Sequence, residues 1–154
     1  MSTTMQRYSL ESTPTLLTRI APIVSRVPLV MLTAIFMLIS VRYLLRPVQE
    51  AAAVGITFSS PGGITVARVG FAGFPLAFAI LALACLISSR RLLAGLYMAL
   101  TLDSVIIAVR VFGILRDHST QSAHLLFPEA VLLVLSLIAI RLEAARRHRE
   151  AISR

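Results

Sequence analysis

The sequence predicts an all-α integral membrane protein, a bundle of four transmembrane helices with both termini in the cytoplasm. Four long apolar runs divide the 154 residues, and 57% of the residues are hydrophobic. Only 14% are charged, against about 25% in soluble domains. Most of the fifteen basic residues, all of them arginine, lie in three of the gaps or ends around the apolar runs. We expect the runs to cross lipid and the arginines to set the orientation.

The first span is predicted at residues 27–45. Pro28 suits a first helical turn, and Pro47 ends the helix. A cleaved signal peptide is the alternative interpretation of this run. Arg42 and Arg46 follow its apolar core directly and make a poor cleavage region, which favours a retained helix.

The tail before this span, residues 1–26, is predicted to be cytoplasmic. Its segment Thr15–Val27 has apolar residues at helical spacing with two arginines between them. It is either an interfacial helix or an irregular lead-in to the first span.

The second span is predicted at 64–88 and the third at 92–115, joined by a turn that contains Arg90 and Arg91. Pro75 lies inside the second span and should kink it. Small residues around this proline favour close helix packing in lipid or a cavity; they are Gly70, Ala72, Gly73 and Ala77.

The fourth span is predicted at 125–142, around the apolar core Phe127–Ile140, and the remaining residues 143–154 form a basic cytoplasmic tail. The orientation follows from the arginines because basic residues are retained on the cytoplasmic side. The N-terminal tail, the turn between spans two and three, and the C-terminal tail therefore share the cytoplasmic side. Their arginines are Arg7, Arg19, Arg26, Arg90, Arg91, Arg141, Arg146, Arg147, Arg149 and Arg154.

Several ionisable residues lie inside the apolar runs, where each costs about 2.5–3.5 kcal/mol at a helix centre. Asp103 lies about 16 Å into the third span, near the middle of the bilayer. Asp103, Arg110 and Asp117 are spaced by seven residues, so they share one face of the helix. We expect this face to point into the bundle or a wet cavity.

Charges from the other spans are predicted at the same outer level as Arg110. Arg42 lies near the outward end of span one, Arg68 near the start of span two and Glu129 in the first turn of span four. One interpretation is a structural pair, Arg110–Glu129 or Arg68–Glu129, that holds the bundle together. The other is a ligand-binding polar cluster made of Arg42, Arg68, Asp103, Arg110, Asp117 and Glu129.

Catalytic, cofactor and metal motifs are not recognisable. The single cysteine, Cys85, lies in an apolar run and is interpreted as a packing residue. The histidines do not form a ligand set, although His118 and His124 share the outer loop with Asp117. Nucleic-acid binding is disfavoured because the arginines lie at the edges of apolar runs. We therefore expect no enzyme activity, no cofactor and no metal.

The stretch from Arg68 to Leu133 resembles a bacterial family of small four-helix membrane proteins known only as a domain of unknown function. The matching elements are Arg68 with Ala72-Gly73, Arg110 with Phe112-Gly113, Asp117, and Pro128-Glu129. The chain departs from that family's pattern at Phe71, where a tyrosine is typical, and at His118, where a glycine is usual. A looser likeness, in fold alone, is to four-helix proteins of the DoxX type. The resemblance implies the fold and singles out these charged residues but implies no reaction.

The resulting expectation is a multi-pass protein of a bacterial inner (plasma) membrane. Its charged pocket near the outer leaflet would bind an anionic lipid or small molecule. Two alternatives stay open: a proton- or cation-coupled transporter that uses Asp103, and an accessory subunit of a membrane redox or assembly complex. The lipid bilayer is the expected partner, with a second copy or another membrane protein as further candidates.

Overall fold

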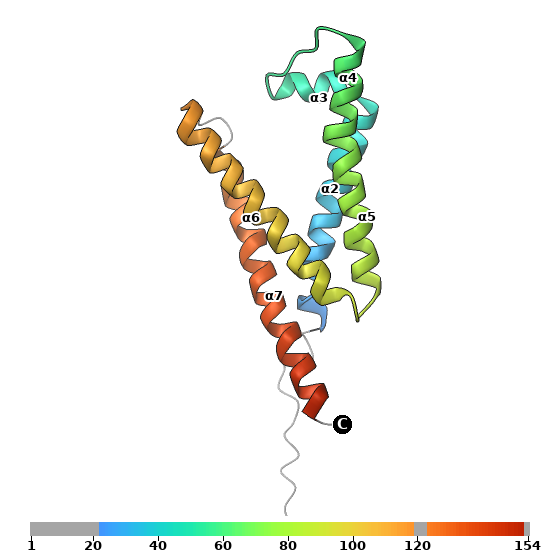
Figure 1. The fold of residues 1–154 in the computed structure, drawn as a ribbon, viewed down its shortest axis with the longest axis vertical. Coiled ribbons are helices and arrows are strands. Elements are labelled where there is room, and N and C mark those ends of the chain that lie inside the picture. The colour runs from blue at the N-terminus through green and yellow to red at the C-terminus, as the bar shows by residue number, and fades with distance from the viewer. Residues whose placement is uncertain (1–21, 119–122, 153–154) are drawn as a thin grey trace, which may run out of the picture.

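The computed structural model describes residues 22–118 and 123–152, which are mostly helical (Figure 1). Within these ranges, four helical segments are long and apolar enough to cross a membrane, which confirms the predicted all-α fold. The elements are α2 (Val27–Leu45), α3 (Pro47–Ala53), α4 (Pro61–Arg68), the π-helical turn η1 (Val69–Gly73), α5 (Phe74–Ile87), α6 (Leu92–Asp117), the 3-10 turn η2 (Ala123–Leu125) and α7 (Leu126–Ile152).

Helix boundaries follow local sequence signals. The first span has the predicted limits, with Pro28 in its first turn. The second begins three residues earlier than predicted, because the Ser60 hydroxyl caps α4 by accepting a hydrogen bond from the Gly63 amide at 3.3 Å. The fourth helix continues to Ile152, so most of the predicted tail is helical. The predicted interfacial helix lies largely outside the described residues, as do Arg7, Arg19 and Arg154.

Large apolar side chains cover the outside of the helices. Ile87, Phe127 and Phe112 are 78%, 77% and 68% exposed, respectively. Soluble proteins rarely leave large contiguous apolar surfaces in water. The exposed apolar side chains therefore agree with a multi-pass membrane protein whose helices contact lipid.

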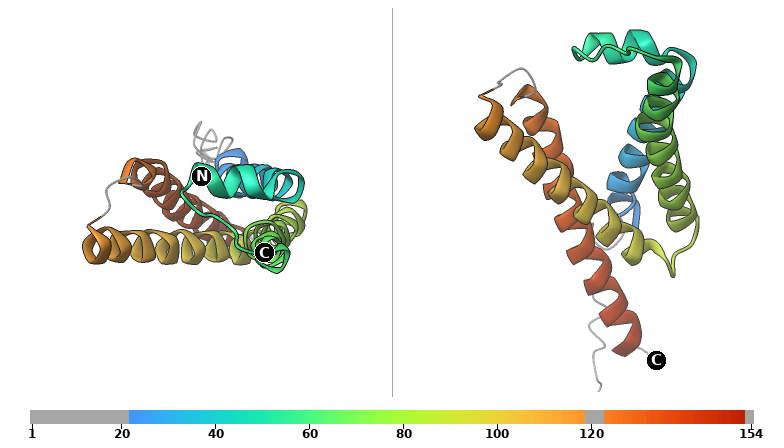
Figure 2. Two further views of the ribbon diagram at one scale, coloured as in Figure 1. Left: turned by 90° about the horizontal axis from the view of Figure 1, so that it is seen from above. Right: turned by 45° about the horizontal axis from the view of Figure 1, so that its top comes forward.

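The helices form two pairs that meet at one end of the molecule and diverge toward the other (Figures 1 and 2). We call α2, α3, α4, η1 and α5 the first arm, and α6 with α7 the second arm. The arms meet at the end that holds the α5–α6 turn, and α3 lies at the diverging end. A hydrophobic cluster joins the arms; it contains Leu29, Leu32, Ala82, Leu92, Leu96, Ala99, Leu132, Ala139 and Ile140.

The arms approach closely at Gly95 of α6. A Cβ atom at this position would lie 2.5 Å from the Cβ atom of Cys85 and 3.0 Å from the Cδ1 atom of Leu29. Only glycine fits this contact without displacing its neighbours. Cys85 packs against the hydrophobic cluster, in agreement with its interpretation as a packing residue.

The second span contains a π-helical turn that ends two residues before Pro75. The proline ring would clash with the carbonyl four residues earlier in a regular α-helix, and the wider turn is one way to accommodate it. The turn also keeps Ala67 and Ala72, five residues apart, on the buried face toward α2. Among the small residues expected to pack, Ala72 is buried, whereas Gly73 and Ala77 are exposed.

Candidate functional site: charged residues on two separated arms

Arg110 and Glu129 form a salt bridge between α6 and α7 near the diverging end. The Arg110 Nε atom donates to the Glu129 oxygens Oε2 and Oε1 at 2.9 and 3.1 Å, and Nη2 also donates to Oε1. Their side chains are only 21% and 17% exposed. Glu129 lies in the first turn of α7, where the helix dipole favours a carboxylate. Of the two predicted pairings for Glu129, the structure shows the one with Arg110.

Asp103 and Asp117 have opposite environments, although both lie seven residues from Arg110. Asp103 is buried, at 3% exposure, and its Oδ2 atom has no hydrogen-bond partner in the described residues. Asp117 is exposed at the end of α6. His118 follows it with a φ of 50°, in the left-handed region. The predicted inward face therefore holds for Asp103 and Arg110 but does not extend to Asp117.

Arg42 lies on the first arm and pairs with a residue that the sequence analysis did not single out. Its Nε atom donates to the Oε1 atom of Glu50 on α3 at 3.0 Å. The arginine side chain is 59% exposed. Tyr43 follows Arg42 in the sequence, and its ring lies against Phe71 of η1, with ring centroids 5.1 Å apart.

Arg68 lines an open cleft on the first arm together with Arg46. The cleft has a volume of about 440 Å³ and lies between the end of α2, the start of α3, and α4. Gln49 and Thr65 add polar groups to its wall. Both arginines are exposed, and neither takes part in a salt bridge within the described residues. This places two free guanidinium groups around a space large enough for a phosphate-sized anion.

The predicted cluster is thus divided between the arms. Arg42 and Arg68 belong to the first arm, and Asp103, Arg110, Asp117 and Glu129 to the second, and the two arms diverge at this end (Figure 2). Within the described residues, no hydrogen bond or salt bridge joins the two sets. A single pocket formed by Arg42, Arg68 and Arg110 is therefore not the arrangement seen.

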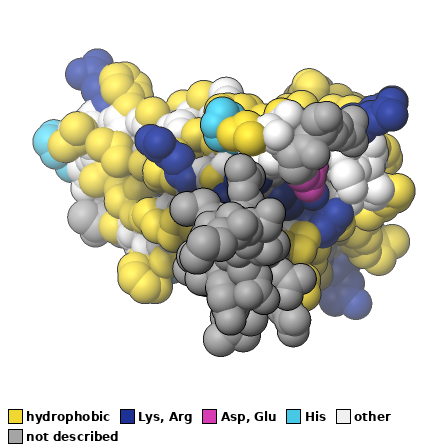
Figure 3. All heavy atoms as spheres, turned by 90° about the horizontal axis from the view of Figure 1, so that it is seen from below, with side chains coloured by type: hydrophobic (Ala, Val, Ile, Leu, Met, Phe, Trp, Pro, Cys, Tyr) yellow, Lys and Arg dark blue, Asp and Glu magenta, His cyan; other side chains and the backbone are white. Residues whose placement is uncertain are grey.

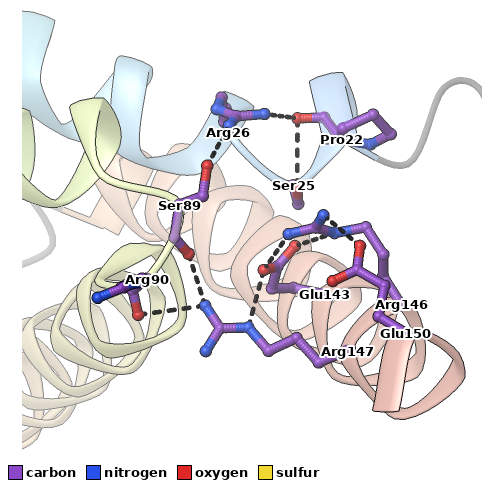
Figure 4. Close-up of polar contacts among 9 residues, drawn as sticks. All are labelled: Pro22, Ser25, Arg26, Ser89, Arg90, Glu143, Arg146, Arg147 and Glu150. Atoms are coloured by element: carbon purple, nitrogen blue, oxygen red, sulfur yellow. Dashed lines mark hydrogen bonds and ion pairs between the residues drawn. The ribbon is translucent and has the colours of Figure 1, made fainter. Parts of the chain in front are cut away.

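A second polar cluster, which sequence reasoning missed, lies where the arms meet (Figure 4). The Glu143 carboxylate of α7 is 1% exposed and accepts hydrogen bonds from Arg146 at 2.8 and 3.0 Å and from Arg147 at 2.9 Å. Arg147 also donates to the carbonyl oxygens of Ser89 and Arg90 at 2.7 and 3.3 Å. These contacts fasten α7 to the α5–α6 turn.

Arg26 completes this cluster from the start of α2. Its Nη1 atom donates to the Pro22 carbonyl at 2.6 Å, and its Nη2 atom lies 3.5 Å from the Ser89 hydroxyl. The three arginine-rich regions predicted to share one side of the membrane therefore meet at one end of the molecule. Figure 3 shows this end, with several arginine patches and a much smaller acidic area.

Sequence signals could have identified Glu143. It lies seven residues after Ser136 and fourteen after Glu129, on the same face of α7, and arginines follow at positions three and four residues later. Glu143 directly follows the predicted span 125–142 and is the first residue of the charged tail, where the hydropathy pattern gives no reason to expect a buried acid.

Groups of three or more potential metal ligands are not present in residues 22–118 and 123–152. Comparison with known proteins shows no matching family model, no matching curated protein and no matching solved structure. The resemblance to a family of unknown function stays a prediction.

Proposed function

We propose that this chain is a multi-pass membrane protein that binds an anionic, phosphate-type group in the cleft between Arg46 and Arg68. The observation that carries the proposal is the pairing state of the arginines. Arg42 and Arg110 each hold a carboxylate, whereas the two arginines of the cleft hold none in the described part of the chain. Guanidinium groups bind phosphate oxygens through paired, charge-assisted hydrogen bonds.

The position of the cleft supports a lipid headgroup as the source of the phosphate. Arg46 directly follows the apolar helix α2, and Arg68 lies at the end of α4, next to Val66 and Val69, which are 72% and 57% exposed. An arginine can keep its stem in apolar surroundings while its head reaches the polar interface. A phospholipid at this level would place its phosphate between the two arginines and its chains along the exposed valines.

The test is binding of phospholipid to the purified protein, measured by native mass spectrometry. We expect retention of phosphatidylglycerol over phosphatidylcholine, with a loss of about tenfold or more in Arg46→Gln and Arg68→Gln. Arg116→Gln is the matched control, because Arg116 is an exposed arginine at the same end of the molecule on the other arm. Equal retention by all four proteins would refute the proposal.

Inorganic phosphate distinguishes a lipid from a soluble anion. If free phosphate displaces the bound lipid at low concentration, the site recognises the phosphate group alone. If it does not, the acyl chains contribute to recognition. The two other expected functions, cation-coupled transport and an accessory role in a complex, stay predictions.

A further inference from the structure

The seam between α6 and α7 carries polar residues at intervals of seven on both helices. The Arg110–Glu129 salt bridge fixes the register of this antiparallel pair. Asp103 lies seven residues before Arg110, and Ser136 lies seven residues after Glu129. Seven residues are almost two helical turns, or roughly 10 Å, so the register places Asp103 and Ser136 at the same level of the seam.

The contacts between α6 and α7 at the end where the arms meet agree with this register. Glu143 lies a further seven residues along α7, at the level of Leu96, and both are buried. Arg147, one turn beyond Glu143, reaches the carbonyls of Ser89 and Arg90 just before α6 begins. The seam is thus in register from the salt bridge to the α5–α6 turn.

Asp103 and Ser136 are both buried and both have an unpartnered oxygen. They are 3% and 0% exposed, and neither Asp103 Oδ2 nor Ser136 Oγ has a hydrogen-bond partner in the described residues. Ser136 differs from other hydroxyls in these helices, which donate to the carbonyl four residues earlier, as a hydroxyl in a helix commonly does. These are Thr33, Ser40, Thr65, Thr101 and Ser104.

The surrounding helices provide no cation for Asp103. Arg110 is the nearest basic residue on its own face, and its guanidinium is bound to Glu129. The only charged residue of α2, Arg42, is bound to Glu50, and α5 has no charged residue. A bare carboxylate within an apolar span is costly, as is an unpaired buried hydroxyl.

We propose that Asp103 and Ser136 form a binding site for a small monovalent cation, a proton or a sodium ion. With a proton bound, the carboxylic acid donates to the Ser136 hydroxyl. With sodium bound, the carboxylate and hydroxyl oxygens are ligands of the kind that hard cations prefer. A divalent cation is disfavoured because it usually needs more than one carboxylate, and Glu129 is already occupied by Arg110.

The experiment is thermal unfolding of the purified protein in detergent, in sodium chloride or choline chloride at equal ionic strength, at acidic and alkaline pH. We expect acid to raise the unfolding midpoint of the wild type in choline chloride. If sodium binds, it should raise the midpoint at alkaline pH by about 3 °C or more. In Asp103→Asn both effects should be lost, because the amide is neutral at every pH.

Three further variants distinguish proton binding from sodium binding and control for other hydroxyl and carboxyl groups. Ser136→Ala should lose the sodium effect and retain an acid effect. Ser104→Ala and Asp117→Asn are matched controls, because these residues are an exposed hydroxyl and an exposed carboxylate on the same helix; both should behave like the wild type. An acid effect alone that requires Asp103 assigns the proton, and a sodium effect that requires it assigns sodium.

The proposal is overturned if Asp103→Asn responds to acid and sodium as the wild type does. If Asp103→Asn does not fold, infrared spectroscopy of the wild type and Ser136→Ala replaces it. A carboxylic-acid C=O band that appears on acidification and shifts in Ser136→Ala supports the site. A band that is absent, or that is the same in both proteins, refutes it.

Discussion

Glu143 is the buried acid on which the packing of the C-terminal helix depends. Its carboxylate binds Arg146 and Arg147, and Arg147 connects it to the α5–α6 turn. Glu143→Gln removes the charge, so Arg147 loses its carboxylate partner and Arg146 keeps only the exposed Glu150. We expect a loss of about 2 kcal/mol of stability, seen as a fall of about 5 °C in the unfolding midpoint in detergent.

Glu150 provides the control for this prediction. It accepts a hydrogen bond from Arg146 at 2.8 Å, but its side chain is 55% exposed. Exposed ion pairs contribute little to stability, so Glu150→Gln should change the unfolding midpoint by no more than about 1–2 °C. Equal effects of the two substitutions would show that burial of Glu143 does not matter.

His118 is a residue whose backbone conformation does not suit its side chain. It ends α6 with a φ of 50°, where a residue with a Cβ atom is strained and glycine is not. We predict that His118→Gly stabilises the protein by about 0.5–1 kcal/mol, measured as a higher unfolding midpoint. A lower midpoint would show that the imidazole makes a contact that outweighs the strain.

The identity of the charged residues could be predicted from the sequence, but most of their partners could not. Arg110 and Glu129 are both unusual for an apolar span, so their pairing was one of two options. Arg42 pairs with Glu50, which lies in a short helix that the hydropathy pattern gives no reason to expect. Arg46 directly follows the first apolar run, and its position beside Arg68 depends on how α4 folds back toward α2.

At the scale of elements, Gly95 allows α5 and α6 to approach each other directly after their turn. A methyl group there would collide with the Cβ atom of Cys85. We predict that Gly95→Ala destabilises the protein by about 1–3 kcal/mol, since the nearest atom is a Cβ, which cannot move away without the backbone of α5. The measurement is the unfolding midpoint in detergent.

Gly113, on the same helix, is the matched control for Gly95. The nearest atom to a Cβ there is Asp117 Oδ2, at 4.0 Å, an ordinary van der Waals distance. Gly113→Ala should therefore be neutral or stabilise the helix by up to about 1 kcal/mol. If Gly113→Ala is as harmful as Gly95→Ala, the close approach of the arms is not the cause.

The π-helical turn shows what a hydropathy pattern cannot predict about an element. Pro75 indicated a kink, and the apolar run gave the span correctly. The extra residue in η1 shifts the register of the small side chains that follow, so that Ala79 and Ala82 are buried and Ala77 is exposed. Predicting the buried face required the local helix type, which residue periodicity alone does not supply.

For the partly buried Arg110–Glu129 salt bridge between α6 and α7, loss of one charged partner should cost more stability than loss of both. Arg110→Gln leaves Glu129 as an unpaired acid in the span, and we expect it to cost about 2–3 kcal/mol. The double variant Arg110→Gln/Glu129→Gln leaves two neutral amides that can bond to each other, so it should cost less than the single variant. Unfolding midpoints of the two variants test this order, and equal or additive losses would contradict it.

At the scale of the whole molecule, the sequence predicts how deep a residue of a spanning helix lies in the membrane, but it does not predict the direction in which the helix is tilted. Counting residues from the turns placed the four charged groups at one level. The two arms diverge at that level, so equal depth does not bring the first-arm arginines to the second-arm acids (Figure 1). The core explains this divergence, because its apolar contacts gather where the arms meet.

Arginine counting predicted one feature of the whole molecule that the structure reproduces. Arg26, Arg90 and Arg147 come from three separate regions of the chain, and their contacts all involve the short turn between α5 and α6. Positive residues on one side of a membrane would be drawn to the same surface. Arg26 and Arg147 both contact Ser89, and Arg90 takes part through its backbone carbonyl, so residues of the three regions meet at one end of the molecule.

The membrane orientation of this end can be measured by cysteine labelling, because the chain has one native cysteine, Cys85, which is half-buried. In a Cys85→Ala background, we expect Thr57→Cys to react with an impermeant maleimide added outside intact cells, and His148→Cys to react only after the cells are opened. Both positions are exposed, and they belong to segments at opposite ends of the molecule: Thr57 to the loop between α3 and α4, and His148 to the C-terminal part of α7 (Figure 1). The arginines near His148 should hold that end in the cytoplasm against the membrane potential. Labelling of His148→Cys from outside, with Thr57→Cys protected, would reverse the topology and place the Arg46–Arg68 cleft at the cytoplasmic leaflet.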